Sequence, residues 1–169
     1  MSSDTPSDIP PPDSMHLSSA TGWIQLGNTA EALADLEKIS ETHRAHCEVL
    51  HLEWHIHARK KDWDRCVELG GYMVERHPTN PAGWINQANA LFYLQRGHDA
   101  FQMLEPVAEH FPGNEAIPYN LACYACQFGD LELALDWYRV AEKVGEPEKI
   151  QEVALMDPDM ELLWEQIRD

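Results

Sequence analysis

Small side chains recur in this sequence every 34 residues, and a fixed period constrains a fold more than any single motif does. One series is small in every unit: Ala32, Cys66, Ala100 and Ala134. A second series contains one large member: Ala20, Trp54, Ala88 and Ala122. The register needs no insertion, so it predicts four units at about 13–46, 47–80, 81–114 and 115–148.

The stretch Asn114–Gly145 shows most clearly what one unit contains. Its first half places Leu121, Ala122 and Ala125 on one helical face, and a break follows at 128–130. Its second half has the spacing of a buried helical stripe, carried by Leu131, Ala134, Leu135, Tyr138 and Ala141. A single helical hairpin cannot bury both apolar faces, so we expect successive units to stack.

Several helix starts are marked in the sequence. Asn80 and Asp157 each precede a proline, and Asn114 opens the fourth unit, so all three are predicted N-caps. Pro118 removes a backbone donor near the start of the next helix. It predicts a helix that begins irregularly, or later than Asn114 suggests.

A 34-residue helix-turn-helix with small residues at two crossings and a proline near its end resembles the tetratricopeptide repeat (TPR) family. The resemblance covers about four fifths of the chain and is strongest in the third and fourth units. The residues that carry it there are Trp84, Ala88, Ala100, Pro112, Asn120, Gly129, Ala134 and Tyr138. Earlier units contribute Trp63, Cys66 and Pro78, and Gly27, Ala32 and Leu36. It implies an all-α fold, a right-handed superhelical stack of hairpins, or α-solenoid.

The two ends of the chain depart from the period. Residues 1–13, rich in Pro, Ser and Asp, are expected to form a flexible leader, and residues 14–169 a single repeat domain. Beyond the fourth unit, residues at about 149–169 are interpreted as capping helices that cover its exposed apolar face. The alternative is that Leu163 and Trp164 dock a partner or a second copy, which would give a homodimer through the C-terminal helix or a terminal repeat.

Charge and composition narrow the classes of partner. With 12 Lys and Arg against 29 Asp and Glu, the net charge of −17 argues against nucleic acid and favours solubility or a basic partner. No apolar run approaches the ~20 residues of a membrane span, and no secretory signal is apparent. Four cysteines do not suggest a disulfide scaffold, so we expect a cytoplasmic protein without a membrane partner.

The resemblance implies that the first helices of the units line a concave groove. The groove residues that it implies are His51, His55, Arg59, Asn86, Asn89, Tyr93, Tyr119, Asn120, Cys123 and Gln127, together with Leu17, Thr21, Ile24, Gln25, Glu48, Ile85, Phe92 and Cys126. We therefore predict a protein-interaction scaffold that binds a peptide or helix of a partner. The alternatives are a small acidic secretion or assembly chaperone and, for the groove itself, side chains that pack against the leader or the capping helices.

Other site chemistries are less well supported by the residues. A clamp for a C-terminal carboxylate, which some family members use, is not expected, because Ile85 and Ala116 occupy its cationic positions. Cys47, His51 and His55 step by four along one helix, so a metal-binding protein built on the second unit is a third alternative.

The remaining motifs do not point to chemistry. Cys123 and Cys126 form a CxxC in mid-helix, away from the helix N-terminus that activates a redox thiol, so small-residue packing explains them better. The sequence has no glycine-rich phosphate loop, nucleophile elbow or HExxH motif. We expect no enzyme activity and no cofactor.

Overall fold

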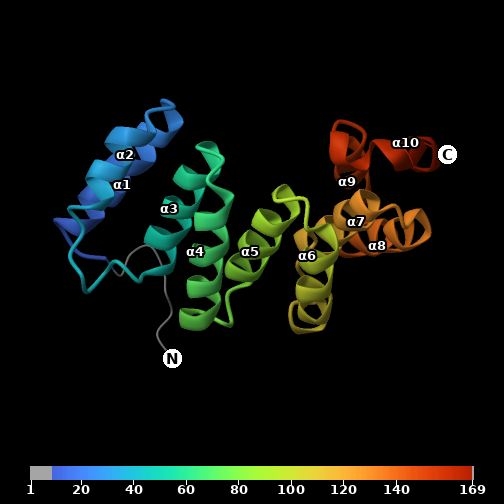
Figure 1. Cartoon of the computed structure of the whole chain (residues 1–169), viewed down its shortest axis with the longest axis horizontal. Helices are drawn as coiled ribbons and strands as arrows, with labels where there is room; N and C mark the ends of the chain where they lie inside the picture. Colours follow the sequence, from blue (N-terminus) through green and yellow to red (C-terminus); the bar gives the residue numbers. More distant parts are fainter. Residues whose placement is uncertain (1–8, 169) are drawn as a thin grey trace. The chain divides into compact units, whose positions relative to one another are not determined.

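A computed structural model describes residues 9–168, and in that part of the chain helices are present and strands are not (Figure 1). The chain divides into two compact units, one ending at Gly83 and the other beginning at Trp84. Each unit is described by itself.

The helices follow one another as hairpins. Those that begin in the first unit are α1 (Asp13–Gln25), α2 (Thr29–Leu36), α3 (Cys47–Arg59), α4 (Trp63–Arg76) and α5 (Pro81–Tyr93). Those that follow are α6 (Gly97–Leu104), the 3-10 helix η2 (Glu105–His110), α7 (Ala116–Phe128), α8 (Leu131–Val144), α9 (Pro147–Ala154), the 3-10 helix η3 (Pro158–Leu163) and α10 (Trp164–Arg168). Helix α1 packs on α2, α3 on α4, and α7 on α8.

The 34-residue period of the sequence is also a period of the backbone. The second helices of the four hairpins begin at Thr29, Trp63, Gly97 and Leu131. The turns before them each contain one residue with positive φ: Gly27 (78°), Lys61 (57°), Gln95 (61°) and Gly129 (86°). Both series advance by 34 residues per repeat, the same spacing as that of the small residues in the sequence.

A repeated hydrogen bond explains the left-handed residue in each turn. The amide after it reaches back to a carbonyl five residues earlier, as in Asn28 N to Trp23 O (2.9 Å) and Asp130 N to Ala125 O (3.1 Å). Closing a helix in this way requires one residue in the left-handed region. The second and third 34-residue repeats make the same bond with Lys61 and Gln95 in place of glycine.

The two series of small residues lie where the helices of a hairpin cross. Ala20, Ala32, Ala122 and Ala134 are all 0 % exposed. In the second 34-residue repeat, Trp54 takes the place of the alanine and is still buried. The Cys66 thiol opposite it lies 3.6 Å from the Trp54 carbonyl oxygen. Small side chains at these positions let the two backbones approach closely.

The polypeptide before α1 is partly inside the core. Of the expected leader, residues 1–8 lie outside the described residues, whereas Ile9 is buried among Ala20, Ile24 and Ile56. Asp13 is buried as well and accepts a hydrogen bond from the Ser40 amide at 3.2 Å. The apolar side chain of Ile9 and the buried carboxylate of Asp13 tie this segment to the first unit.

The polypeptide after α8 folds back onto the second unit. Helix α9 contacts α8, and η3 contacts both α7 and α8. The buried side chains of this segment are Ile150, Ala154, Met160, Leu163 and Ile167. Leu163 is fully buried, and the half-buried Trp164 donates its Nε1 proton to the Ala154 carbonyl at 2.8 Å.

The N-caps predicted at Asn80 and Asp157 are confirmed, whereas the N-cap of α7 is Glu115 and not Asn114. Asn80 Oδ1 accepts from the Ala82 amide at 2.9 Å, and Asp157 Oδ1 accepts from the Asp159 amide at 3.0 Å. Asn114 Oδ1 accepts from the Ala116 amide at 3.0 Å. Helix α7 begins at Ala116, so Pro118 lies in its first turn, where a backbone amide has no acceptor within the helix.

Candidate functional site

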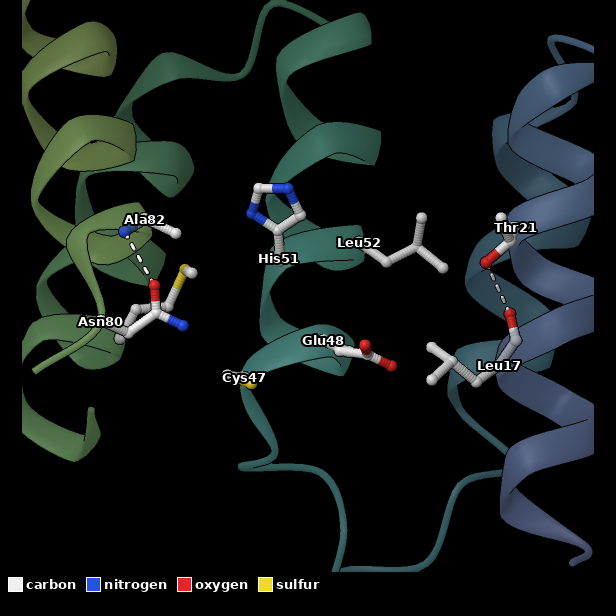
Figure 2. Close-up of a pocket in the computed structure, with 9 residues that line it drawn as sticks. Leu17, Thr21, Cys47, Glu48, His51, Leu52, Asn80 and Ala82 are labelled. Carbon is white, nitrogen blue, oxygen red and sulfur yellow. Dashed lines mark hydrogen bonds between the residues drawn. The ribbon is translucent and has the colours of Figure 1, made fainter. Parts of the chain in front are cut away.

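A pocket of about 490 Å³ opens in the first unit between α1 and α3 (Figure 2). Its lining combines apolar and polar side chains: Leu17, Thr21, Cys47, Glu48, His51, Leu52, Met73, Asn80 and Ala82. All of these residues belong to the first unit. A concave site of this size with few polar groups is the usual form of a binding site.

Helical spacing brings the pocket residues together. Leu17 and Thr21 are one turn apart on α1, and the Thr21 hydroxyl donates to the Leu17 carbonyl at 2.9 Å. Glu48, His51 and Leu52 lie on one face of α3 because three and four residues make about one turn. The structure thus brings together four of the groove positions taken from the resemblance, on two different helices.

Glu48 is the pocket's acidic group. Its side chain is half-buried and extends from α3 toward Leu17 on α1 (Figure 2). Its backbone amide donates to His46 Nδ1 at 3.3 Å, whereas its carboxylate has no hydrogen bond or ion pair with any other residue between 9 and 168. A carboxylate in this setting gains most from a basic group supplied by a partner.

His51, His55 and Arg59 follow one another at single-turn intervals on α3. The Nε2 atoms of His51 and His55 are 2.9 Å apart. Burial lowers the pKa of His51, and the neighbouring His55 lowers it further. Burial also lowers the pKa of His55, with a smaller contribution from the charge of Arg59. Both rings are therefore neutral at neutral pH.

The candidate metal ligands do not converge as a set of three. Cys47 is buried in the pocket wall, while His51 and His55 face each other. Between residues 9 and 168, no group of three His, Cys, Asp or Glu side chains has the arrangement of a metal site.

Several groove candidates of the second unit are used within the fold. The Tyr119 hydroxyl donates to Asp157 Oδ2 at 2.8 Å, so the segment before η3 covers it. Asn89 Oδ1 accepts from the Tyr124 hydroxyl at 2.6 Å, and Gln127 donates to the Phe92 carbonyl at 3.0 Å. The Tyr119 contact matches the alternative in which groove positions pack against the capping helices. The contacts of Asn89 and Gln127 are instead made between α5 and α7.

The other groove candidates of the second unit differ in exposure. Asn86 and Cys123 are each 5 % exposed, so neither offers much surface to a partner. Asn120 is half-buried, and Tyr93 is 49 % exposed. Tyr93 and Asn120 are therefore the groove candidates of this unit with the most accessible surface.

The cysteines are poor nucleophiles. Burial raises the pKa of Cys126 to about 11, and it raises the pKa of Cys123 well above its usual value, with Asp157 and Asp159 adding to both effects. A thiol reacts as the thiolate, which these surroundings disfavour. Packing accounts for the CxxC pair.

No sequence motif indicated one cluster of a hydroxyl, an imidazole and a carboxylate, which Ser40, His43 and Asp13 form. Asp13 Oδ2 lies 2.7 Å from His43 Nδ1 and also accepts from the Ser40 hydroxyl. Ser40 Oγ approaches the same Nδ1 at 3.2 Å. A serine hydrolase needs the hydroxyl on the ring nitrogen opposite the carboxylate. This cluster instead holds the turn after α2 against the start of α1.

Sequence reasoning also missed part of the pocket. Leu52, Met73, Asn80 and Ala82 line it, although the groove positions of the resemblance do not include them. Met73 belongs to a second helix and Asn80 to a connection, so no periodic signal within the first helices marks them.

Comparison with known proteins supports the fold and gives no family. No family profile matches the chain, and neither does any curated protein sequence. Solved structures of MamA, a helical repeat protein, are similar to it. MamA from Desulfovibrio magneticus RS-1 (residues 41 to the end) is 19 % identical over 90 % of this chain and 89 % of that one, with a TM-score of 0.68.

Two further MamA structures agree with this result. MamA MSR-1 is 19 % identical over 92 % of this chain and 86 % of that one, with a TM-score of 0.62. MamA AMB-1 is 18 % identical over 92 % and 88 %, with a TM-score of 0.61. The chain therefore has an all-α helical-repeat fold.

Between residues 9 and 168, no helix is both long enough and apolar enough to cross a membrane.

Proposed function

We propose that this chain is a scaffold for protein–protein interaction, built from repeats of the tetratricopeptide kind, which binds a peptide or helical segment of a partner along the first helices of its hairpins. The pocket between α1 and α3 carries the proposal, because it unites residues of two first helices in one concave site. The similarity to helical-repeat structures supports a binding role and offers no sign of catalysis.

The chemistry of the pocket suggests what the partner presents. Leu17 and Leu52 provide apolar wall, and Glu48 provides a carboxylate that has no hydrogen-bond or ion-pair partner among residues 9–168. A lysine or arginine side chain suits this combination, since its stem is apolar and its end is cationic. The net charge of −17 would also favour the approach of a basic segment.

Site-specific photo-crosslinking tests the proposal. A photoreactive phenylalanine replaces Thr21, which lines the pocket, and in a matched control it replaces Ala34, an exposed small residue on α2. We expect a discrete cross-linked partner from position 21 that is absent from position 34. Glu48→Ala should weaken capture of that partner. Equal products at both positions, or none at position 21, would contradict the proposal.

A second candidate function is that of a secretion or assembly chaperone, favoured by the apolar surface of Leu17, Leu52 and Met73 in the pocket. A chaperone keeps its client soluble, whereas a scaffold binds a partner that is already folded. Co-expression of the cross-linked partner with this chain and with the Glu48→Ala variant distinguishes them. Loss of partner solubility in the variant would indicate a chaperone.

A further inference from the structure

His51 and His55 form a close pair on α3, where His51 is half-buried and His55 is exposed. Their Nε2 atoms are 2.9 Å apart, their ring centroids are 4.4 Å apart, and the ring planes meet at 85°. Residues four apart on a helix lie one above the other, so α3 places both side chains on the same face.

The separation of the nitrogens matches one metal geometry. Two imidazole nitrogens at about 2.0–2.1 Å from an ion are about 2.9 Å apart at a 90° angle and about 3.3 Å apart at a tetrahedral angle. Square-planar or tetragonal coordination by nitrogen and oxygen is characteristic of Cu²⁺, which also binds nitrogen ligands most tightly among divalent first-row ions. We propose that His51 and His55 form a bidentate Cu²⁺ site whose remaining positions are filled by water. One of its two ligands, His51, also lines the pocket of the proposed partner site.

The surroundings of the pair contain charges of both signs. Arg59 lies one turn beyond His55 and opposes a cation, whereas Glu48, about one turn before His51, favours one. Trp54 packs edge-on against His55 with the ring centroids 5.3 Å apart, which restricts that imidazole. Since residues 9–168 offer no third protein ligand in position, the site is a two-ligand chelate of modest affinity.

Metal binding requires little proton movement. In the apo pair one Nε2 carries the hydrogen that the other accepts. On binding, that hydrogen moves to Nδ1 of the same ring, two nitrogen–copper bonds form, and two waters leave the ion. No redox step is involved.

The test titrates the full chain, without a histidine tag, with CuCl₂ at pH 7.4, using calorimetry and electron paramagnetic resonance. The variants are His51→Gln, His55→Gln and the double variant, and His98→Gln is the control because His98 is another exposed histidine outside α3. Wild type and control should bind one Cu²⁺ with two equatorial nitrogens. Each single variant should lose at least roughly tenfold in affinity, because the chelate is broken.

The double variant should bind no more tightly than the single variants. Affinity that is unchanged in the double variant, or reduced equally by His98→Gln, would overturn the proposal, and so would a spectrum with one equatorial nitrogen in wild type. Circular dichroism confirms that each variant is folded. Cross-linking from position 21 is measured on the same proteins without copper, so failure of the metal site and failure of the partner site are distinguishable.

Discussion

Lys61 and Gln95 show how strongly the repeat determines the backbone conformation of single residues. Lys61 and Gln95 adopt the left-handed conformation that glycine supplies in the first and fourth units. A residue with a Cβ is less stable in that conformation by about 1–2 kcal/mol. The turn is kept because its backbone hydrogen bond ends the preceding helix in every unit.

Glycine at these positions should therefore stabilise the protein. We expect Lys61→Gly and Gln95→Gly each to raise the free energy of unfolding by up to about 1 kcal/mol, measured by urea denaturation. The adjacent Lys60 has φ of −81°, so Lys60→Gly is the matched control and should lower stability. A gain in all three variants would show that the left-handed strain is not the cause.

Two buried carboxylates should govern acid stability. The Ser40 hydroxyl, followed by His43, lowers the pKa of Asp13 from 3.8 to about 2. Lys38, followed by the Ser19 hydroxyl, lowers the pKa of Asp35 from 3.8 to about 2. A carboxylate with a depressed folded-state pKa stabilises the fold above its unfolded pKa, and this stability is lost as pH falls from about 3.8 toward 2.

Unfolding followed against pH checks this expectation. Asp13→Asn and Asp35→Asn should reduce stability at pH 7 and flatten its decline between pH 4 and pH 2. Glu75→Gln, at an exposed position on α4, is the control and should leave the decline unchanged. A decline that keeps its full slope in both asparagine variants would assign acid sensitivity to other groups.

At the scale of elements, the hairpin depends on small residues at its crossing. Ala134 on α8 is 0 % exposed and lies in the contact with α7. We expect Ala134→Leu to overpack this crossing and cost about 1–3 kcal/mol. Glu132→Leu adds the same side chain at an exposed position of α8, where the cost should be small. Chemical denaturation of both variants provides the comparison, and equal costs would contradict a packing effect.

The C-terminal segment offers a test with two adjacent leucines. Leu163, the last residue of η3, is 0 % exposed, and Leu162 is 58 % exposed. Leu163→Ala should cost about 2–5 kcal/mol by opening a cavity in the second unit. Leu162→Ala should stay within about 0.5 kcal/mol of wild type. Similar values from thermal or urea unfolding would argue that this segment does not pack as described.

At the scale of the whole molecule, acidic charge is in large excess. The 29 acidic residues exceed the 12 basic residues, so most carboxylates have no cationic partner. Self-repulsion of a net charge of −17 destabilises the compact state, and salt screens it.

The melting temperature should therefore rise as NaCl increases from 10 to 150 mM, because the Debye length shortens over this range and repulsion is screened. Sucrose at equal osmolality is the control, since it does not screen charge. A melting temperature that falls with salt would mean that attractive ion pairs outweigh the repulsion.

Much of the fold could be predicted because it depends on residues that are close together in the sequence. The positions of Gly27 and Gly129, the cap at Asn80, and the small residues at the crossings each act within one hairpin. Their recurrence in four units made the register unambiguous. The all-α repeat fold followed from these residues alone.

The site could be predicted only in part. Leu17, Thr21, Glu48 and His51 do line one pocket, as their equivalent positions on first helices suggested. By contrast, Tyr119 bonds Asp157, which lies in a segment where the period has already ended. No repeat position describes that segment, so its return to α7 could not be deduced from spacing.

The sequence by itself determined the repeat, its helices, its turns and its acidic character, because each depends on residues close together in the chain or on composition. Only the tertiary structure decided which of the aligned first-helix side chains remain accessible. Accessibility depends on contacts between distant residues, such as Tyr124 with Asn89, and on side-chain burial against elements outside the repeat. For that reason, the same repeat position can line a pocket in the part of the chain before Trp84 and make an internal contact in the part after it.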